Sequence, residues 1–377
     1  MNKLFSVLLL LLSTSVLASE ITNKAIIESV GDIHSITLDK NQSLTVYLPE
    51  GYADNNLKYP VMYVMDSQRY FLHSIAYQKT LTWQDKSPAF IVVGINTEGL
   101  NRKELFSNNS DEFIGTIQNK IVAHIEKHYR VNNMRMYFGW EKAGGFALEL
   151  FAKQPKLFDA YFLASSTHFS KERLNSVNNI LESNESTAKF FYYSLGSVES
   201  WALKSHKTLS SIFKKNYKSD LKWEFNLSKN DDHYSTPLNT FNKGLALYFS
   251  DYSPIRFYSI KEFKDFGGMT ALKKHYKNRG DHYQISQDIH DDTKHYLLNQ
   301  SINEGDFEFF KMLVNEFDGF IEEFDYSTGF IKKIGQFYLD NKAIAEAVSL
   351  YQSELIKNPK SDELLDALSQ ISQEHQQ

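Results

Sequence analysis

The sequence predicts a doubly wound α/β domain with a mostly parallel sheet, followed by an all-helical region. Three observations support this fold class. Strand-like and helix-like segments alternate from about Ile33 to Tyr252, as they do when helices connect parallel strands. Most of the strand-like segments are almost continuously apolar, which is typical of strands covered on both faces of a sheet. After Tyr252 the strand-like pattern ends.

Segments rich in Val, Ile, Tyr and Phe predict the strands. In chain order they are Ser43–Leu48, Pro60–Met65, Ala89–Ile95, Met134–Phe138, Ala160–Ala164, Phe190–Leu195 and Leu221–Leu227. The helices expected between the later strands are Asp111–Tyr129, Ala143–Lys153, Lys171–Leu181 and Glu199–Tyr217. In the first of these helices, apolar residues recur at helical spacing and form one face: Phe113, Ile117, Ile121, Ile125 and Tyr129.

Residues 256–377 are expected to form helices joined by short polar turns. One window there fits the tetratricopeptide pattern at most of its signature positions, namely Ile331, Ile334, Gly335, Tyr338, Ala347, Tyr351 and Pro359. Because one repeat cannot bury its own apolar face, Leu298–Phe317 and Leu364–Ile371 are its expected packing partners. The region is then either a capping bundle without a ligand or a groove that binds a peptide or a protein partner.

Residues 1–18 have the three parts of a secretory signal peptide. Lys3 lies in a short n-region, an apolar run extends from Leu4 to Leu12, and Val16-Leu17-Ala18 provides a small-residue cleavage site. The apolar run is shorter than the ~20 residues of a spanning helix. We therefore predict a signal peptide at 1–18, an α/β domain at 19–254 and a helical domain at 255–377, without a membrane span. The expected location is the periplasm or outside the cell.

The composition excludes several classes of function. The chain contains 0 cysteines, which excludes disulfides, thiol catalysis and cysteine-ligated metals. A net charge of −5, with Lys and Glu interspersed, leaves no basic stripe for nucleic acid. Asp231-Asp232-His233 comes nearest to a metal-binding cluster, but one histidine beside acids is typical of a solvated turn. We expect no cofactor and no metal.

A nucleophile-elbow pattern follows one predicted strand. Gly139-Trp140-Glu141-Lys142-Ala143-Gly144 connects the strand Met134–Phe138 to the helix Ala143–Lys153. Small residues around such a turn allow the strained backbone that presents a nucleophile. The position of the nucleophile is occupied by Glu141 instead of a serine.

Two further residues complete the candidate site. In hydrolases with such an elbow, an acid and then a histidine follow the nucleophile along the chain. Glu199, just after a buried strand, is the acid candidate, and His233 in the loop after the last strand is the histidine candidate. That loop leads into a helix that starts near Pro237, a position that suits proline. Because open α/β sheets place their sites at the carboxyl ends of strands, we expect these residues to meet.

These motifs resemble the putative-esterase branch of the α/β-hydrolases, which includes the enterobactin-type esterases. The matching segments are Tyr47–Tyr52, Tyr59–Asp66, Val92–Asn96 with Arg102, His128–Arg130, the elbow, and Asp232–Pro237. They extend over about residues 33–252. Some members of this family also carry a tetratricopeptide-like tail. The resemblance implies ancestral hydrolysis of carboxylic esters and a small-molecule ester or acyl ligand.

The resemblance also assigns residues. It places the family's serine at Glu141, its histidine at His233 and its acid at Glu199. The oxyanion hole would use backbone N–H groups of Lys142 and of Ser67 or Gln68. The sequence departs from the family at three places: glutamate replaces serine, Asp66-Ser67 replaces Asp-Gly, and Ala143 replaces the far glycine of the elbow.

Three interpretations remain open at this point. The first is a pseudo-hydrolase that binds a ligand or partner, because a glutamate cannot carry out serine chemistry. The second makes Glu141 a carboxylate nucleophile, with His233 activating water. The third retains hydrolysis by general-base activation of water through His233 or Glu141. We also predict that Glu141 and His233 lie within hydrogen-bond reach, with Glu199 on the other side of the imidazole.

Overall fold

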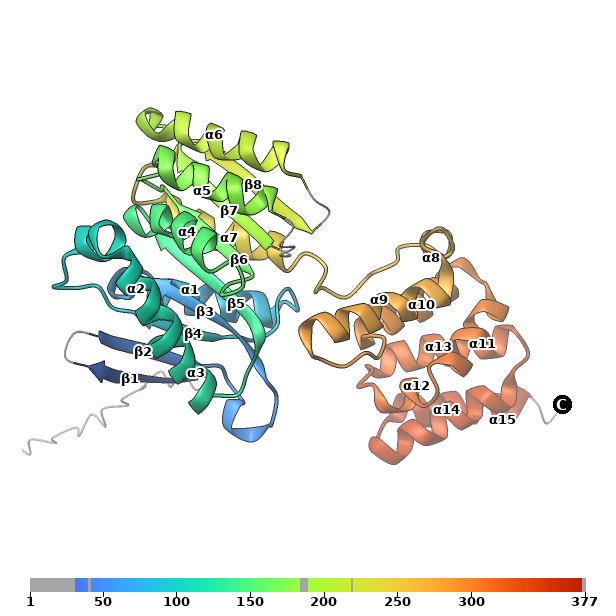
Figure 1. Cartoon of the computed structure of the whole chain (residues 1–377). Coiled ribbons are helices and arrows are strands. Elements are labelled where there is room, and N and C mark those ends of the chain that lie inside the picture. The colour runs from blue at the N-terminus through green and yellow to red at the C-terminus, as the bar shows by residue number, and fades with distance from the viewer. Residues whose placement is uncertain (1–30, 40–41, 184–188, 218–219, 375–377) are drawn as a thin grey trace, which may run out of the picture.

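The computed structural model describes residues 31–39, 42–183, 189–217 and 220–374. The signal peptide predicted at residues 1–18 lies outside these ranges. Figure 1 shows an α/β domain followed by a helical region, joined by the segment between α7 and α8. None of the helices in the described ranges combines the length and the hydropathy that a membrane crossing requires.

An 8-stranded sheet forms the centre of the α/β domain, in the order β1-β2-β4-β3-β5-β6-β7-β8. The strands are β1 (Asp32–Asp39), β2 (Gln42–Leu48), β3 (Tyr59–Met65), β4 (Ile91–Ile95), β5 (Val131–Trp140), β6 (Ala160–Ala164), β7 (Lys189–Gly196) and β8 (Leu221–Ser228). The β1–β2 and β2–β4 pairs are antiparallel, and all the other pairs are parallel. This confirms the mostly parallel sheet.

The burial of the strands explains why most of them were predictable. Every residue of β3, β4 and β6 is buried, because helices cover both faces of the sheet. Strand β1 was not predicted. It lies at the edge of the sheet, where Ile33 is 44% exposed, and so it lacks a continuous apolar run.

Helices form a layer on each face of the sheet (Figure 1). On one face, α1 (Ser67–Trp83) and α7 (Thr236–Tyr248) bury side chains such as Phe71 and Phe241. The other face carries α2 (Ser110–Thr116), α3 (Ala123–His128), α4 (Lys142–Lys153), α5 (Lys171–Glu182) and α6 (Ser200–Lys215). Helix α1 was not predicted, because its buried side includes Ser74 and Gln78 and shows no continuous apolar stripe.

The rest of the described chain is helical. It contains α8 (Ile260–Phe266), α9 (Gly268–Tyr283), α10 (Asp291–Glu304), α11 (Phe307–Glu316), α12 (Phe320–Glu323), α13 (Thr328–Asp340), α14 (Ile344–Lys357) and α15 (Asp362–Glu374). One apolar core runs through these helices from Phe257 to Ile371. Helices α13 and α14 touch where Gly335 lies against Tyr351, since a Cβ on Gly335 would approach the tyrosine ring to 2.2 Å. The tetratricopeptide assignment itself stays a prediction.

Helix α9 connects the two parts of the molecule. Its Leu272 and Tyr276 belong to the core of the helical region, whereas Tyr283 at its end belongs to the core under the sheet. Arg279 Nε also donates a hydrogen bond to the Tyr252 carbonyl oxygen at 2.6 Å. The helical region is therefore anchored to the α/β domain through a buried aromatic side chain and a charged hydrogen bond.

Candidate active site

The elbow backbone is formed in full around Glu141. This residue lies in the turn between β5 and α4 with φ 55° and ψ −117°, a conformation that L-residues rarely adopt. Such a conformation costs of order 1–3 kcal/mol and persists only where the surroundings hold it. The Glu141 N–H donates to the Ala164 carbonyl oxygen at 3.1 Å, and the Glu141 carbonyl accepts from Thr167 N–H at 3.0 Å. The turn is thus fixed by β6 and the loop after it.

Small residues allow the backbone to turn tightly around Glu141 and to pack closely against its neighbours. A Cβ on Gly139 would lie 2.8 Å from the carbonyl carbon of Ala143, across the turn. A Cβ on Gly144 would lie 2.0 Å from the Ser166 hydroxyl oxygen. Gly139 therefore lets the turn close on itself, and Gly144 lets it pack against the segment after β6, in agreement with the small residues of the motif.

The Glu141 carboxylate is held by two cations. One oxygen, Oε2, accepts a hydrogen bond from Arg102 Nη1, and the other, Oε1, accepts from Lys142 Nζ at 2.8 Å. Burial acts to raise the pKa of Glu141, but the hydrogen bonds from Lys142 and Arg102 outweigh it and the pKa is lowered. Glu141 is therefore an ionised, fully paired carboxylate at neutral pH.

Arg102 is positioned independently of Glu141. Its Nε and Nη2 donate to the two oxygens of Asp66 at 2.9 and 2.8 Å, and Asp66 is only 1% exposed. Asp66 also accepts the hydroxyl hydrogen of Thr97. The guanidinium carbon lies 5.3 Å from the Trp140 ring centroid. Burial acts to lower the pKa of Arg102, but its contacts with Asp66 and Glu141 outweigh burial and the pKa is raised. Arg102 is therefore a permanent cation.

Glu199 and His233 form a second pair beside the elbow. His233 Nδ1 lies 2.7 Å from Glu199 Oε1. The other oxygen of Glu199 accepts the Ser165 hydroxyl at 2.6 Å and the Gly196 N–H at 2.8 Å. Burial acts to raise the pKa of Glu199, but these hydrogen bonds, first the one to His233, lower it. The His233 imidazole is therefore oriented by an ionised carboxylate. Ser165, directly after β6, and Gly196, at the end of β7, hold that carboxylate in place.

Glu141 and His233 line one open cavity of about 410 Å³, together with Glu199, Thr167, Val198, Trp201, Asp232 and Tyr234. Within the described part of the chain, however, no hydrogen bond joins Glu141 to His233. The expected contact is replaced by the pairing of Glu141 with Arg102 and Lys142. A carboxylate gains more from two permanent cations than from an imidazole, which explains the difference.

The predicted oxyanion residues lie on two sides of the elbow. Lys142 begins α4, and Ser67 and Gln68 are in the first turn of α1, whose N–H groups have no partner within the helix. The Gln68 side chain is engaged with Thr97, donating to its hydroxyl at 3.0 Å. Nothing in this arrangement assigns an oxyanion role to these residues, and that role stays a prediction.

Sequence reasoning missed two supporting residues, Ser165 and Thr97. Ser165 follows β6 with φ 41°, is fully buried and bonds Glu199. Polar residues directly after buried strands were the available signal, because the carboxyl ends of parallel strands meet at one edge. The ion pair between Asp66 and Arg102 was not predicted either, although both residues belong to the motifs of the resemblance.

The strand order, the elbow and the acid–histidine pair together define an α/β-hydrolase fold. The chain belongs to the putative-esterase family, whose sequence profile matches residues 35–234. This confirms the resemblance drawn from the motifs.

Individual relatives are distant in sequence. An uncharacterized protein of Bacillus subtilis (strain 168), YbbA, is 24% identical over 177 residues, which are 42% of this chain and 69% of that protein. An IroE-like serine hydrolase from Shewanella oneidensis superposes with a TM-score of 0.59 at 17% identity, covering 75% of this chain and 98% of that one. An uncharacterised protein from Capnocytophaga ochracea gives 0.62 at 16% identity, covering 90% and 99%. These structures support the fold alone.

Proposed function

We propose that this protein is a pseudo-hydrolase of the putative-esterase family, which binds a ligand at the inherited site without serine-dependent ester hydrolysis. The observation that carries the proposal is the Glu141 carboxylate at the elbow, with one oxygen on Arg102 and the other on Lys142. The family's serine is replaced here by a group that is already ionised and paired.

A glutamate lacks both chemical properties that a serine esterase needs at this position, namely a hydroxyl proton to transfer and a surrounding that stabilises an oxyanion. A serine attacks a carbonyl when a histidine accepts its proton, and a carboxylate has no such proton to give. The negative charge of Glu141 also occupies the neighbourhood in which an oxyanion would need hydrogen-bond donors. A substrate carbonyl would meet a carboxylate there, and its developing negative charge would be repelled.

A second candidate function is hydrolysis in which Glu141 acts as nucleophile or base. The intact pair of His233 and Glu199 favours it, because this pair is what activation of water would need. The lowered pKa of Glu141 opposes it, since a weakly basic carboxylate with both oxygens hydrogen-bonded is a poor base and a poor nucleophile.

The expected ligand is a small molecule of the ester or acyl class, as the family membership suggests. The cavity is consistent with this class. Trp201 and Tyr234, which are 63% and 70% exposed, place large apolar surfaces next to His233. Exposed aromatic side chains at the rim of a pocket are suited to hold the apolar part of a ligand.

Reintroducing the serine tests the proposal. The wild-type protein should hydrolyse activated esters only at the background rate and should resist fluorophosphonate labelling. Glu141→Ser should gain labelling and a modest esterase rate, because the strained turn, His233 and Glu199 are all present. The gain should stay modest, since each missing oxyanion donor costs ~10²–10³ in rate.

Two controls separate the candidate functions. His233→Ala in the Glu141→Ser background should abolish the gained activity. Glu141→Gln in the otherwise wild-type protein should lose native turnover if Glu141 is a nucleophile or base, and should leave the background hydrolysis rate unchanged if the protein is a pseudo-hydrolase. Stoichiometric serine labelling of the wild-type protein, lost in His233→Ala, would disprove the pseudo-hydrolase.

Export of the protein is also proposed, on the basis of residues 1–18. The mature protein should begin at Ser19 and be recovered from the periplasm or the medium. N-terminal sequencing of the exported protein is the measurement, and retention of Met1 would contradict the proposal.

A further inference from the structure

The cavity beside Glu141 (the elbow cavity) has two exposed aromatic rings at its rim. The ring centroid of Trp201, on α6, lies 6.4 Å from that of His233, and the centroid of Tyr234, in the loop before α7, lies 5.4 Å from it. Both side chains line the cavity of about 410 Å³, and they are 63% and 70% exposed. A ligand in the cavity can therefore contact aromatic surface from two separate segments of the chain.

A third ring of the site, that of Trp140, already carries cations of the protein. The guanidinium carbons of Arg69 and Arg102 lie 5.5 and 5.3 Å from its centroid, within the range of a cation–π interaction. In the described part of the chain, no lysine or arginine lies over the rings of Trp201 and Tyr234 in this way. The faces of these two rings are therefore available to a cation that a ligand brings.

The charged residues that line the elbow cavity are acidic. They are Glu141, Glu199 and Asp232, and no lysine or arginine is among the described residues of the lining. Oδ1 of Asp232 accepts the N–H groups of Tyr234 at 2.8 Å and of Ser235 at 2.9 Å. These hydrogen bonds, first the one from Ser235, lower the pKa of Asp232, so it is ionised at neutral pH. An acid without a lysine or arginine partner therefore lies next to the exposed rings.

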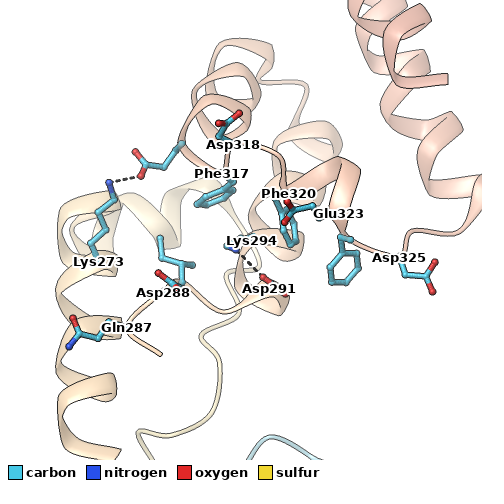
Figure 2. A pocket seen from close by; sticks show the side chains of 13 residues that line it. Lys273, Gln287, Asp288, Asp291, Lys294, Phe317, Asp318, Phe320, Glu323 and Asp325 are labelled. Atoms are coloured by element: carbon cyan, nitrogen blue, oxygen red, sulfur yellow. Dashed lines mark hydrogen bonds and ion pairs between the residues drawn. The ribbon is translucent and has the colours of Figure 1, made fainter. Parts of the chain in front are cut away.

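A cavity of about 860 Å³ in the helical region shows the opposite arrangement (Figure 2). Its lining also includes carboxylates, such as Asp318 and Asp325, but the rings of Phe317 and Phe320 are only 6% and 5% exposed. Lys294 already lies 4.8 Å from the Phe320 ring centroid. Open ring faces beside a carboxylate thus distinguish the elbow cavity, and this combination is the chemistry that recognises an organic cation.

We propose that the elbow cavity binds a ligand of the ester or acyl class that carries a quaternary ammonium group. The inference rests on the proposed function, because it specifies the ligand of the same site. The N-methyl groups of such a cation present apolar surface to Trp201 and Tyr234, while its charge is attracted to the ring faces and to Asp232. A quaternary ammonium group has no N–H, so contact with the rings leaves no hydrogen-bond donor unsatisfied, whereas a primary ammonium would lose hydrogen bonds to water.

The experiment compares choline with its neutral carbon analogue, in which a tert-butyl group replaces the trimethylammonium group. Isothermal titration calorimetry on the mature full chain should show saturable binding of choline. Choline should bind about fivefold to tenfold more tightly than the analogue, because the two have the same shape and only choline is attracted to the ring faces. Added salt should weaken the binding of choline alone, since only choline interacts with the charge of Asp232.

Variants of exposed residues locate the site without disturbing the core. Trp201→Leu keeps an apolar side chain and removes the ring face, so it should weaken choline binding about threefold and leave the neutral analogue nearly unchanged. Trp83→Leu is the matched control, because Trp83 at the end of α1 is 85% exposed and lies outside the cavity, and it should alter neither affinity. Asp232→Asn keeps the Oδ1 acceptor of the turn and should weaken the binding of choline alone.

Three results would overturn the inference. These are the absence of saturable choline binding, equal binding of choline and the neutral analogue, and equal losses of choline affinity in Trp201→Leu and Trp83→Leu. None of them bears on the pseudo-hydrolase, which is judged by ester hydrolysis and serine labelling. Conversely, hydrolysis of acetylcholine by the wild-type protein, lost in His233→Ala, would overturn the pseudo-hydrolase, whereas selective binding of choline would still support the cation site.

Discussion

At the scale of single residues, Glu141 places a carboxylate at the centre of a turn of the nucleophile-elbow type. The backbone has a positive φ of 55° at this residue, the conformation that presents a nucleophile in hydrolases with such an elbow. Neighbouring cations hold the carboxylate in place. Arg102 and Lys142 each donate to one carboxylate oxygen, so the side chain is fixed by the charges that converge on the elbow.

The charge of Glu141 should therefore contribute to stability in a pH-dependent way. Its pKa in the folded protein is lowered from 4.5, so its stabilisation is fully present above the unfolded-state value. It is lost as the pH falls through the folded-state value. Glu141→Gln should reduce the free energy of unfolding by about 1–2 kcal/mol at pH 7. The difference from wild type should shrink below about pH 4.5.

Urea unfolding at a series of pH values measures this difference. Glu112→Gln is the control, because Glu112 is an exposed acid on α2 without an ion pair in the described residues, and its effect should be near zero at every pH. A Glu141→Gln difference that stays constant down to pH 3, or grows there, would contradict the pairing.

At the scale of elements, close contacts between helices decide where small residues are needed. Helices α13 and α14 approach so closely at Gly335 that an added Cβ would meet the Tyr351 ring at 2.2 Å. In the same helix α13, Gly329 has no atom within 4 Å of the corresponding position. The two glycines thus differ in packing while they share one helix.

Substituting each of these glycines separately by alanine should change the stability of the helical region in opposite directions. Gly335→Ala should destabilise the helical region by about 1–3 kcal/mol, because the ring of Tyr351 must shift in a packed core. Gly329→Ala should stabilise it by about 0.5–1 kcal/mol, since alanine loses less backbone entropy in a helix. Denaturant midpoints followed by circular dichroism measure both. Equal effects of the two variants would refute the close contact.

At the scale of the whole molecule, α9 links two apolar cores. Tyr283 is 1% exposed, its ring centroid lies 5.9 Å from that of Phe249, and its hydroxyl donates to Asp251 at 2.5 Å. The boundary predicted between residues 254 and 255 lies between α7 and α8, and the packing continues across it through Tyr283. Truncation at that boundary would remove a side chain from the core under the sheet.

Tyr283→Ala should accordingly destabilise the α/β domain from outside its own sequence range. We expect a loss of about 3–5 kcal/mol from the deleted aromatic ring. Tyr283→Phe, which removes only the hydroxyl, should cost about 1 kcal/mol. The readout is the unfolding midpoint of the α/β domain, followed by its tryptophan fluorescence. If Tyr283→Ala left that midpoint unchanged, the two cores would be independent.

Much of the fold follows from local patterns. The continuous apolar runs at Pro60–Met65 and Ala160–Ala164 predicted buried parallel strands, which β3 and β6 confirm. Strand β1 and helix α1 escaped prediction because an exposed edge strand and a helix with buried Ser74 and Gln78 carry weak periodic signals. Long-range pairing and packing, rather than local preference, determine such elements.

In the candidate site too, some features follow from the sequence and others only from the fold. The sequence alone determined the elbow motif, the glutamate at its central position, and the order of Glu141, Glu199 and His233, because these are properties of the chain. The expected contact between Glu199 and His233 is present. Only the tertiary structure decided that Glu141 pairs with Arg102 and Lys142 and not with His233. The physical reason is that Arg102, which is distant in sequence, and the adjacent Lys142 compete with His233 for one carboxylate, and the fold sets the distances on which the outcome depends.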